Sequence, residues 1–346
     1  MRALFAHGKL FVFGEWSVLF GGRAVLACAE AGLRGSLALR PCEGAPSFTF
    51  SSVDFGTVRT WKYAGAWREV GGVAASSGAI DVAGAVMTEA SELLGAPGVD
   101  VSLEVVSEGL FAPDGQKYGF GSSGALSALV AKALCAGAGV ADEEQTLQLA
   151  MAGHRRAQAG KGSGADVAVS VLGGTLVFSL PDPPTFSGAS LGARPPTVVR
   201  ARKPDGLELL SVWSGREADT RALMRQIQAL AESDPARWAE TLAQVRGRAE
   251  EGVCAWLEGR VDAVLESAAA SSEALRAMGL AAGVSVVTRA HDDISLCVDR
   301  AAGASAVAKT SGAGGGDMAV VLARSQALDA VKEALDKEGY RWMALM

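Results

Sequence analysis

The sequence is poor in the residues that build metal clusters and disulfide frameworks. Its 346 residues include five cysteines and three histidines. The cysteines are scattered and form no C-x-x-C pair: Cys28, Cys42, Cys135, Cys254 and Cys297. Because zinc sites and disulfide scaffolds need thiols at characteristic spacings, we expect neither and interpret these residues as buried free thiols.

The sequence also lacks an excess of basic residues and any long apolar run. Lysine and arginine number 32 against 38 acidic residues, and the net charge of −6 argues against nonspecific binding to nucleic acid. No run of about 18 uncharged apolar residues occurs, so we expect no membrane-spanning helix. No apolar core precedes Lys9, so we expect no signal peptide. These absences predict a cytoplasmic protein without a nucleic-acid or membrane partner.

The remaining composition is that of a globular chain with a substantial core. Apolar residues make up 49% and charged residues 20% of the sequence. The length suits one large or two medium domains. Prolines are densest at Pro181, Pro183, Pro184, Pro195 and Pro196. We therefore place a domain boundary there, with domains over residues 1–185 and 186–346.

Hydrophobic periodicity predicts strands and helices in both halves. In the first half it predicts strands at residues 10–13, 24–31, 33–40, 48–50, 58–63, 99–106 and 174–178, and helices at 80–94 and 143–159. In the second half it predicts strands at 207–213 and 318–322, and helices at 217–231, 235–257, 260–278 and 325–338. A strand-rich half followed by a helix-rich half that returns to a sheet indicates an α+β fold.

A glycine- and serine-rich segment precedes a further helical pattern. Residues 119–125 read Gly-Phe-Gly-Ser-Ser-Gly-Ala, and apolar residues then recur at helical spacing from Leu126. The free N–H groups and the dipole at a helix N-terminus favour phosphate, which small side chains allow to approach closely. Hydroxyl groups at this loop are suited to phosphate or magnesium. The candidate contacts are Gly119, Gly121, Ser122, Ser123, Gly124 and Ala125.

The glycine spacing of residues 119–124 matches the dinucleotide fingerprint G-x-G-x-x-G, but its context does not. That fingerprint requires a strand that ends at the first glycine. Here the preceding predicted strand ends near Val106, a dozen residues too early. A dinucleotide-dependent dehydrogenase is therefore disfavoured.

Two common kinase signatures are also missing. Gly8-Lys9 and Gly160-Lys161 are not followed by Ser or Thr, so no Walker A motif occurs. An Asp-Phe-Gly sequence at residues 54–56 precedes the glycine-rich loop, which reverses the order found in protein kinases. The phosphate loop must then belong to another class of nucleotide-binding protein.

Two further clusters accompany this loop. Gly8-Lys9 leads into an apolar strand, and Gly162–Asp166 places an acid just after a tight turn. A surface lysine and a helix N-cap are alternative interpretations of these two groups. Phosphoryl transfer needs positioned phosphates, a cation, a lysine and an acid. Together the three clusters predict a kinase for a small alcohol or phosphate.

In this order, the clusters resemble the motifs of the GHMP kinases, the family of galactokinase, homoserine kinase, mevalonate kinase and phosphomevalonate kinase. Residues 8–21, 119–125 and 309–317 are similar to the family's first, second and third motifs. The resemblance implies an N-terminal domain like the second domain of ribosomal protein S5 and a ferredoxin-like C-terminal domain. It also implies that ATP and Mg²⁺ bind in the cleft between them.

Within the family, residues 154–168 and the loop 311–317 look most like the phosphomevalonate kinases. Mevalonate kinases carry a magnesium-binding glutamate eleven residues before the aspartate, where this chain has Arg155. Trp16 also departs from the Tyr or His usual in relatives. The resemblance implies ATP-dependent conversion of 5-phosphomevalonate to 5-diphosphomevalonate in the mevalonate route to isoprenoids. Mevalonate kinase, another small-molecule kinase, an ATP-consuming decarboxylase and a non-catalytic nucleotide-binding regulator remain alternatives.

The resemblance also implies roles for individual residues. Ser122 and Ser123 would bind phosphate and magnesium, Lys9 would stabilise the transferring charge, and Asp166 would orient or deprotonate the acceptor oxygen. The phosphorylated substrate would contact Lys117, Arg155, Lys161, Ser163, Gly314 and Gly315. Further candidate cations are Arg156, Arg202, Lys203, Arg289 and His291. We interpret His154 as a packing or hydrogen-bonding helix residue and expect a monomer or homodimer.

Overall fold

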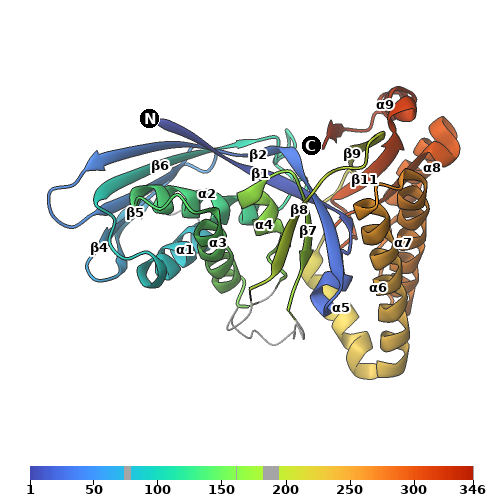
Figure 1. The fold of residues 1–346 in the computed structure, drawn as a ribbon, viewed down its shortest axis with the longest axis horizontal. Coiled ribbons are helices and arrows are strands. Elements are labelled where there is room, and N and C mark those ends of the chain that lie inside the picture. Colours follow the sequence, from blue (N-terminus) through green and yellow to red (C-terminus); the bar gives the residue numbers. More distant parts are fainter. Residues whose placement is uncertain (74–78, 161, 182–194, 346) are drawn as a thin grey trace.

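The structure, a computed structural model, describes residues 1–73, 79–160, 162–181 and 195–345. A strand-rich N-terminal half and a helix-rich C-terminal half lie side by side along the long axis of the molecule (Figure 1). The predicted α+β class is confirmed. The proposed domain boundary at residue 185 lies outside the described residues.

A large sheet forms the frame of the N-terminal half. Its strands are β1 (Arg2–Phe13), β2 (Arg23–Pro41), β3 (Ser47–Ser52), β4 (Thr57–Tyr63), β5 (Trp67–Val73), β6 (Val99–Glu108), β7 (Thr175–Ser179) and β8 (Thr197–Ala201). The order is β5-β4-β3-β6-β2-β7-β8, with β1 paired to β2. Strands β3 and β6 pair in parallel, and the other pairs are antiparallel. The β1–β2 register shifts between His7 and Lys9, so the ladder is irregular where Lys9 emerges.

Four helices cover one face of this sheet (Figure 1): α1 (Ala79–Leu93), α2 (Ser122–Gly137), α3 (Glu143–Ala157) and α4 (Ala165–Leu172). Helix α2 is apolar or small on nearly every side and is buried along almost its whole length. A helix with this all-round pattern is stable only inside a core. Its burial against the sheet, α1, α3 and α4 holds the glycine-rich loop at its N-terminus in one place.

The C-terminal half contains a second, antiparallel sheet and five helices, which include the two longest helices of the described chain. Strands β9 (Leu207–Trp213), β10 (Ala306–Thr310), β11 (Met318–Arg324) and β12 (Trp342–Ala344) are ordered β10-β11-β9-β12. The helices are α5 (Thr220–Ser233), α6 (Pro235–Leu257), α7 (Val261–Ala281), α8 (Arg289–Ala302) and α9 (Leu328–Lys337). Helices α7 and α8 pack on β10. The third motif, residues 309–317, begins in this strand and is therefore covered by the two helices where it starts.

The two halves share buried apolar residues. The main core cluster contains residues of the first sheet together with Val253 and Trp256 of α6 and Val320 of β11. Trp16, in the turn after β1, is buried among Ile227 and Met278 of the C-terminal helices. This continuity holds the N-terminal motifs against the C-terminal ones.

Several elements differ from the sequence prediction. The strands predicted at 24–31 and 33–40 form one long strand, β2, because Gly32 keeps extended geometry beneath Phe5. Helix α8 and strands β5, β8 and β10 were not predicted. The N-terminus of α8 is capped by reciprocal hydrogen bonds between Thr288 and His291, a less usual partner than Glu or Gln.

Candidate active site

The loop before α2 has the backbone geometry of an anion site. Gly119 and Gly121 have φ angles of 90° and 78°, values that favour glycine. Gly121 is the N-cap of α2, and no side chain caps the first N–H groups of the helix. Those donors, with no acid in the first turn, are free to bind an anion. Ser122 and Ser123 follow at partly exposed positions.

Lys9 and Asp166 approach this loop from two different elements. A side chain at Gly121 would lie 3.2 Å from Lys9 Cε and 3.5 Å from Asp166 Cβ. The Lys9 N–H donates to the Phe120 carbonyl at 2.8 Å, which ties β1 to the loop. Asp166 lies in the first turn of α4 and also approaches Gly124, the third residue of α2. The fold therefore brings a lysine and a carboxylate together at one helix N-terminus.

His154, on α3, connects the serine loop to this carboxylate. Its Nε2 atom lies 3.1 Å from Ser123 Oγ and 3.8 Å from Asp166 Oδ2. The amide nitrogen of Gln158 is 3.0 Å from the same Nε2. The imidazole is almost fully buried. The interpretation of His154 as a hydrogen-bonding residue agrees with this geometry, but its contacts lie in the candidate site itself.

Asp317 at the end of the third motif also reaches the phosphate loop. A side chain at Gly119 would lie only 2.4 Å from Asp317 Cβ. The Asp317 carboxylate accepts the Ala218 N–H at 2.9 Å. Burial raises the pKa of Asp317, while that N–H and the positive charge of Lys9 oppose the rise. The two glycine-rich loops are therefore in direct contact.

The residues predicted to contact the substrate lie on separate segments of the chain. The positive charge of Lys117 acts to lower the pKa of Asp317, and the Lys117 backbone N–H donates to Glu217. Ser163 Oγ accepts the Ala165 N–H at 3.2 Å at the start of α4. Arg155 is half-buried on α3, and successive helical residues point about 100° apart, so it leaves the helix on another face than His154. Lys161 lies outside the described residues.

The glycines of the third motif face in two directions. Gly314 approaches the Val286 carbonyl, and Gly315 donates its N–H to the same carbonyl at 2.8 Å and lies against Leu223. These two predicted substrate residues thus contact the connection between α7 and α8, and Gly315 also contacts α5. Gly312 is the loop glycine that faces Lys9, since a side chain there would lie 4.0 Å from Lys9 Nζ.

The other candidate cations are engaged elsewhere. Four form ion pairs outside the loops: Arg156 with Glu89, Arg202 with Asp205, Lys203 with Glu208, and Arg289 with Asp293. His291 is buried, and burial lowers its pKa to about 4. It is therefore neutral near pH 7 and was wrongly proposed as a cation.

A partly buried lysine joins the three elements that carry the candidate site. Lys132 of α2 donates to the Phe5 carbonyl of β1 at 2.9 Å and to the Ser170 carbonyl of α4 at 3.2 Å. Burial lowers the pKa of Lys132 to about 8. The same side chain thus links the strand of Lys9, the helix of Ser123 and the helix of Asp166.

Sequence analysis did not identify the connection between the first and third motifs. Lys309 of β10 forms a buried ion pair with Glu15, 294 positions away. Trp16 Nε1 donates to the Ala313 carbonyl at 3.1 Å. The only sequence signal was a lone acid and a lone lysine, each beside a glycine-rich segment.

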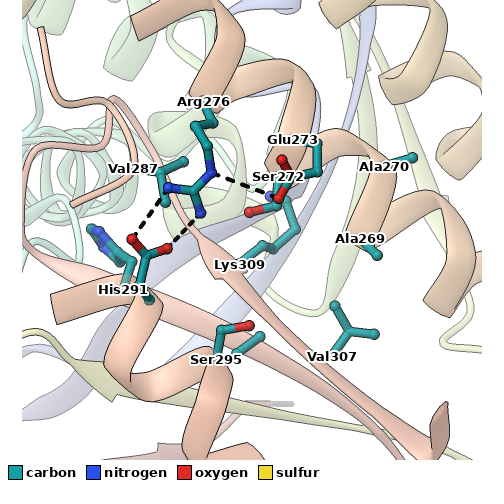
Figure 2. Close-up of a pocket in the computed structure, with 12 residues that line it drawn as sticks. Ala269, Ala270, Ser272, Glu273, Arg276, Val287, His291, Ser295, Val307 and Lys309 are labelled. Atoms are coloured by element: carbon teal, nitrogen blue, oxygen red, sulfur yellow. Dashed lines mark hydrogen bonds and ion pairs between the residues drawn. The ribbon is translucent and has the colours of Figure 1, made fainter. Parts of the chain in front are cut away.

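A separate cavity of about 270 Å³ lies between α7, α8 and β10 (Figure 2). Its lining includes Ser272, Glu273, Arg276, Ser295 and Lys309. The guanidinium of Arg276 pairs with Asp292 across it. This cavity does not include the phosphate loop, Lys9 or Asp166.

Comparison with known proteins shows which sequences this chain is similar to. Residues 81–174 match the sequence model of a family described as GHMP kinases N terminal domain. This stretch contains the phosphate loop and Asp166. A curated phosphomevalonate kinase of Streptomyces sp. (strain CL190) is 26% identical over 340 residues, which cover 93% of this chain and 90% of that protein.

Solved structures share the whole fold. A Lin0012 protein from Listeria innocua superposes with a TM-score of 0.82 at 20% identity, covering 99% of this chain and 97% of the other. Streptococcus pneumoniae phosphomevalonate kinase, in complex with phosphomevalonate and AMPPNP, gives 0.75 at 20% identity, covering 99% and 100%. Within the described residues, no helix is long and apolar enough to span a membrane.

Proposed function

The chain carries a GHMP kinase N-terminal domain within a GHMP kinase fold, and from this premise we propose that it phosphorylates 5-phosphomevalonate. The products are 5-diphosphomevalonate and ADP. The observation that carries the proposal is the convergence of Lys9 and Asp166 on Gly121, the N-cap of α2. The match to a phosphomevalonate kinase along 93% of the chain supports the choice of acceptor.

In this proposal, the loop before α2 binds the phosphates of ATP. Its uncapped N–H groups and the dipole of α2 offset the negative charge of the triphosphate. Lys9 adds a positive charge where the γ-phosphoryl group passes to the acceptor. Most of the catalytic effect in phosphoryl transfer comes from such positioning and charge stabilisation.

The acceptor determines what Asp166 has to do. An acceptor phosphate monoester is mostly ionised at neutral pH, because its second pKa is about 6. An acceptor oxygen of phosphomevalonate therefore bonds to the γ-phosphorus as the bond to the ADP oxygen breaks, with little need for a base. We propose that Asp166 holds Lys9 and a cation bound at the loop before α2 in position. These two positive charges would then orient the acceptor phosphate. Lys9 also reduces the repulsion between the two anionic reactants.

The same residues fit magnesium. Hydroxyl and carboxylate oxygens are donors that Mg²⁺ prefers, and the ion usually keeps water and phosphate among its ligands. In the described part of the chain, no group of three or more His, Cys, Asp or Glu side chains could hold a metal. We propose Ser122 and Ser123 as the protein's ligands, with Asp166 beside them. The bound ion would neutralise charge on the transferred phosphoryl group.

A coupled ADP-release assay tests the proposal, with phosphomevalonate and mevalonate supplied in parallel. We expect release with phosphomevalonate and little with mevalonate at the same concentration, and loss of release in the Asp166→Asn variant. Release with mevalonate alone would assign the chain to the other acceptor. ATP binding without transfer to either would indicate a nucleotide-binding regulator, and carbon dioxide release would indicate a decarboxylase.

A further inference from the structure

Residues 11–16 and residues 309–313 are joined by several side-chain contacts, which we call the motif clamp. Lys309 Nζ donates to Glu15 and, at 3.0 Å, to the Thr310 carbonyl. Ser311 Oγ accepts the Phe11 N–H and donates to the Phe11 carbonyl, both at 2.9 Å. With the bond from Trp16 to Ala313, these contacts fasten the end of β1 to the start of the third motif.

The ion pair in the motif clamp is fully desolvated. The Lys309 side chain is 0% exposed and the Glu15 side chain 3% exposed. Removing two charges from water costs about as much as their attraction returns, so such pairs add little net stability. A pair of this kind is better explained by what it holds in place. Here it holds a strand and a loop from opposite ends of the chain.

The clamped segments carry groups of the candidate site. Phe11 lies two residues after Lys9, and the Lys9 ammonium lies 5.0 Å from the Phe11 ring centre. Gly312, directly after Ser311, faces that ammonium, and Asp317 at the loop's end contacts Gly119. The position of loop 312–317 relative to Lys9 and to the phosphate loop therefore depends on the motif clamp.

The cavity behind β10 gives Lys309 an alternative position. Lys309 lines this cavity together with Glu273 (Figure 2) and Asp292. Its ammonium nevertheless donates to Glu15. Without Glu15, the flexible lysine side chain has room in this cavity, where Glu273 and Asp292 pair with Arg276. Its link to the first motif would then be lost.

We propose that Glu15 and Lys309 are positioning residues whose ion pair sets loop 312–317 against Lys9 for phosphoryl transfer. The expected effect on kcat rests on the proposed function. The expected effect on the position of loop 312–317 rests only on the contacts described above. A displacement of about 1 Å in such a site costs up to about 100-fold in rate.

The test compares single and double replacements. Lys309→Met leaves the Glu15 carboxylate buried without a partner, so we expect Tm to fall by roughly 5–10 °C. In Glu15→Met the Lys309 side chain can turn toward the cavity, so we expect a smaller fall in Tm. The double variant removes both charges and keeps apolar volume, so we expect its Tm within about 3 °C of the parent protein. Its kcat should nevertheless fall at least about 10-fold, with a smaller change in the KM for ATP. Arg34→Met with Glu108→Met, an exposed ion pair within the first sheet, is the matched control.

Amide hydrogen exchange supplies a readout that does not require activity. We expect faster exchange at residues 311–317 in the double variant and unchanged exchange in the control. A double variant with parental kcat and parental exchange would overturn the proposal. If the double variant does not fold, Glu15→Gln removes the ion pair but keeps the size of the side chain, and parental exchange and kcat there would overturn it equally. The two proposals can also fail separately. If the parent protein transfers no phosphate but the double variant exchanges faster at residues 311–317, the motif clamp is supported and the proposed function is rejected.

Discussion

His154 Nε2 lies 3.1 Å from Ser123 Oγ, so a side chain of α3 holds Ser123, the second residue of α2. When the serine hydroxyl donates its proton to this nitrogen, the oxygen lone pairs remain directed away from the imidazole. Lone pairs in that orientation are available to a cation. The same nitrogen lies 3.8 Å from Asp166, so one imidazole affects the geometry of both groups.

Replacing His154 should separate hydrogen bonding from packing. His154→Phe fills the space but cannot accept the Ser123 proton, and we expect kcat to fall at least about 30-fold. His154→Gln offers an amide oxygen, and we expect it to retain activity within about 10-fold of the parent. Steady-state kinetics at several magnesium concentrations measures both. Equal activity in the two variants would show that the hydrogen bond has no role.

Gly119 should not tolerate a side chain, because Asp317 already occupies the space beside it. Gly119→Ala would bring Cβ within 2.4 Å of Asp317 Cβ, and we expect kcat/KM to fall about 100-fold. Gly115→Ala is the control, since Gly115 has a similar φ of 85° but open space around it. Parallel kinetics and melting curves distinguish the two. Similar losses in both variants would mean that backbone strain, and not the contact with Asp317, limits this loop.

Loss of either charge beside Gly121 should abolish most turnover while preserving the fold. We expect Asp166→Asn and Lys9→Met each to lower kcat at least about 100-fold, because both act on charge that develops during transfer. Circular dichroism and thermal melting provide the control for folding. Near-normal turnover in both variants would refute the proposed roles.

Lys132 should make stability depend on pH in the alkaline range. Its pKa is about 8 in the folded protein and 10.5 in the unfolded chain, so between these values the unfolded chain binds more protons. The free energy of unfolding then gains an increment as pH rises from 8 to 10.5, by roughly 3 kcal/mol at most. Below pH 8 this increment is absent.

Lys132→Met removes that titration. Denaturant unfolding across this pH range should show the increment in the parent protein and in Lys62→Met, an exposed control, but not in Lys132→Met. A parent and a Lys132→Met variant with parallel stability curves would show that Lys132 does not titrate in this range.

Local sequence patterns predicted the parts of the site that depend on one segment. The loop before α2 was recognisable because glycines, hydroxyls and a helical pattern lie within a few residues of one another. The helix predicted at 235–257 matches α6, because Asp234 and Pro235 mark its start. Helix α8 was harder to recognise, since its narrow apolar stripe includes Ile294 and Val298 but few other large residues.

Contacts between distant segments could not be predicted from such patterns. Nothing near Glu15 indicates Lys309, since the two residues meet only after both halves have folded. His154 showed no sign of its contact with Ser123, because the packing of α2 against α3 sets that distance. The roles predicted for Lys117, Lys161, Arg155 and Ser163 stay predictions.

The phosphorus spectrum of the reaction products tests the central claim most directly. The protein is incubated with ATP, magnesium and 5-phosphomevalonate, and ³¹P resonances are followed over time. We predict that the phosphate monoester resonance is replaced by two coupled resonances of a diphosphate while ADP accumulates. A monoester resonance that persists, with no new diphosphate ester, would contradict the account.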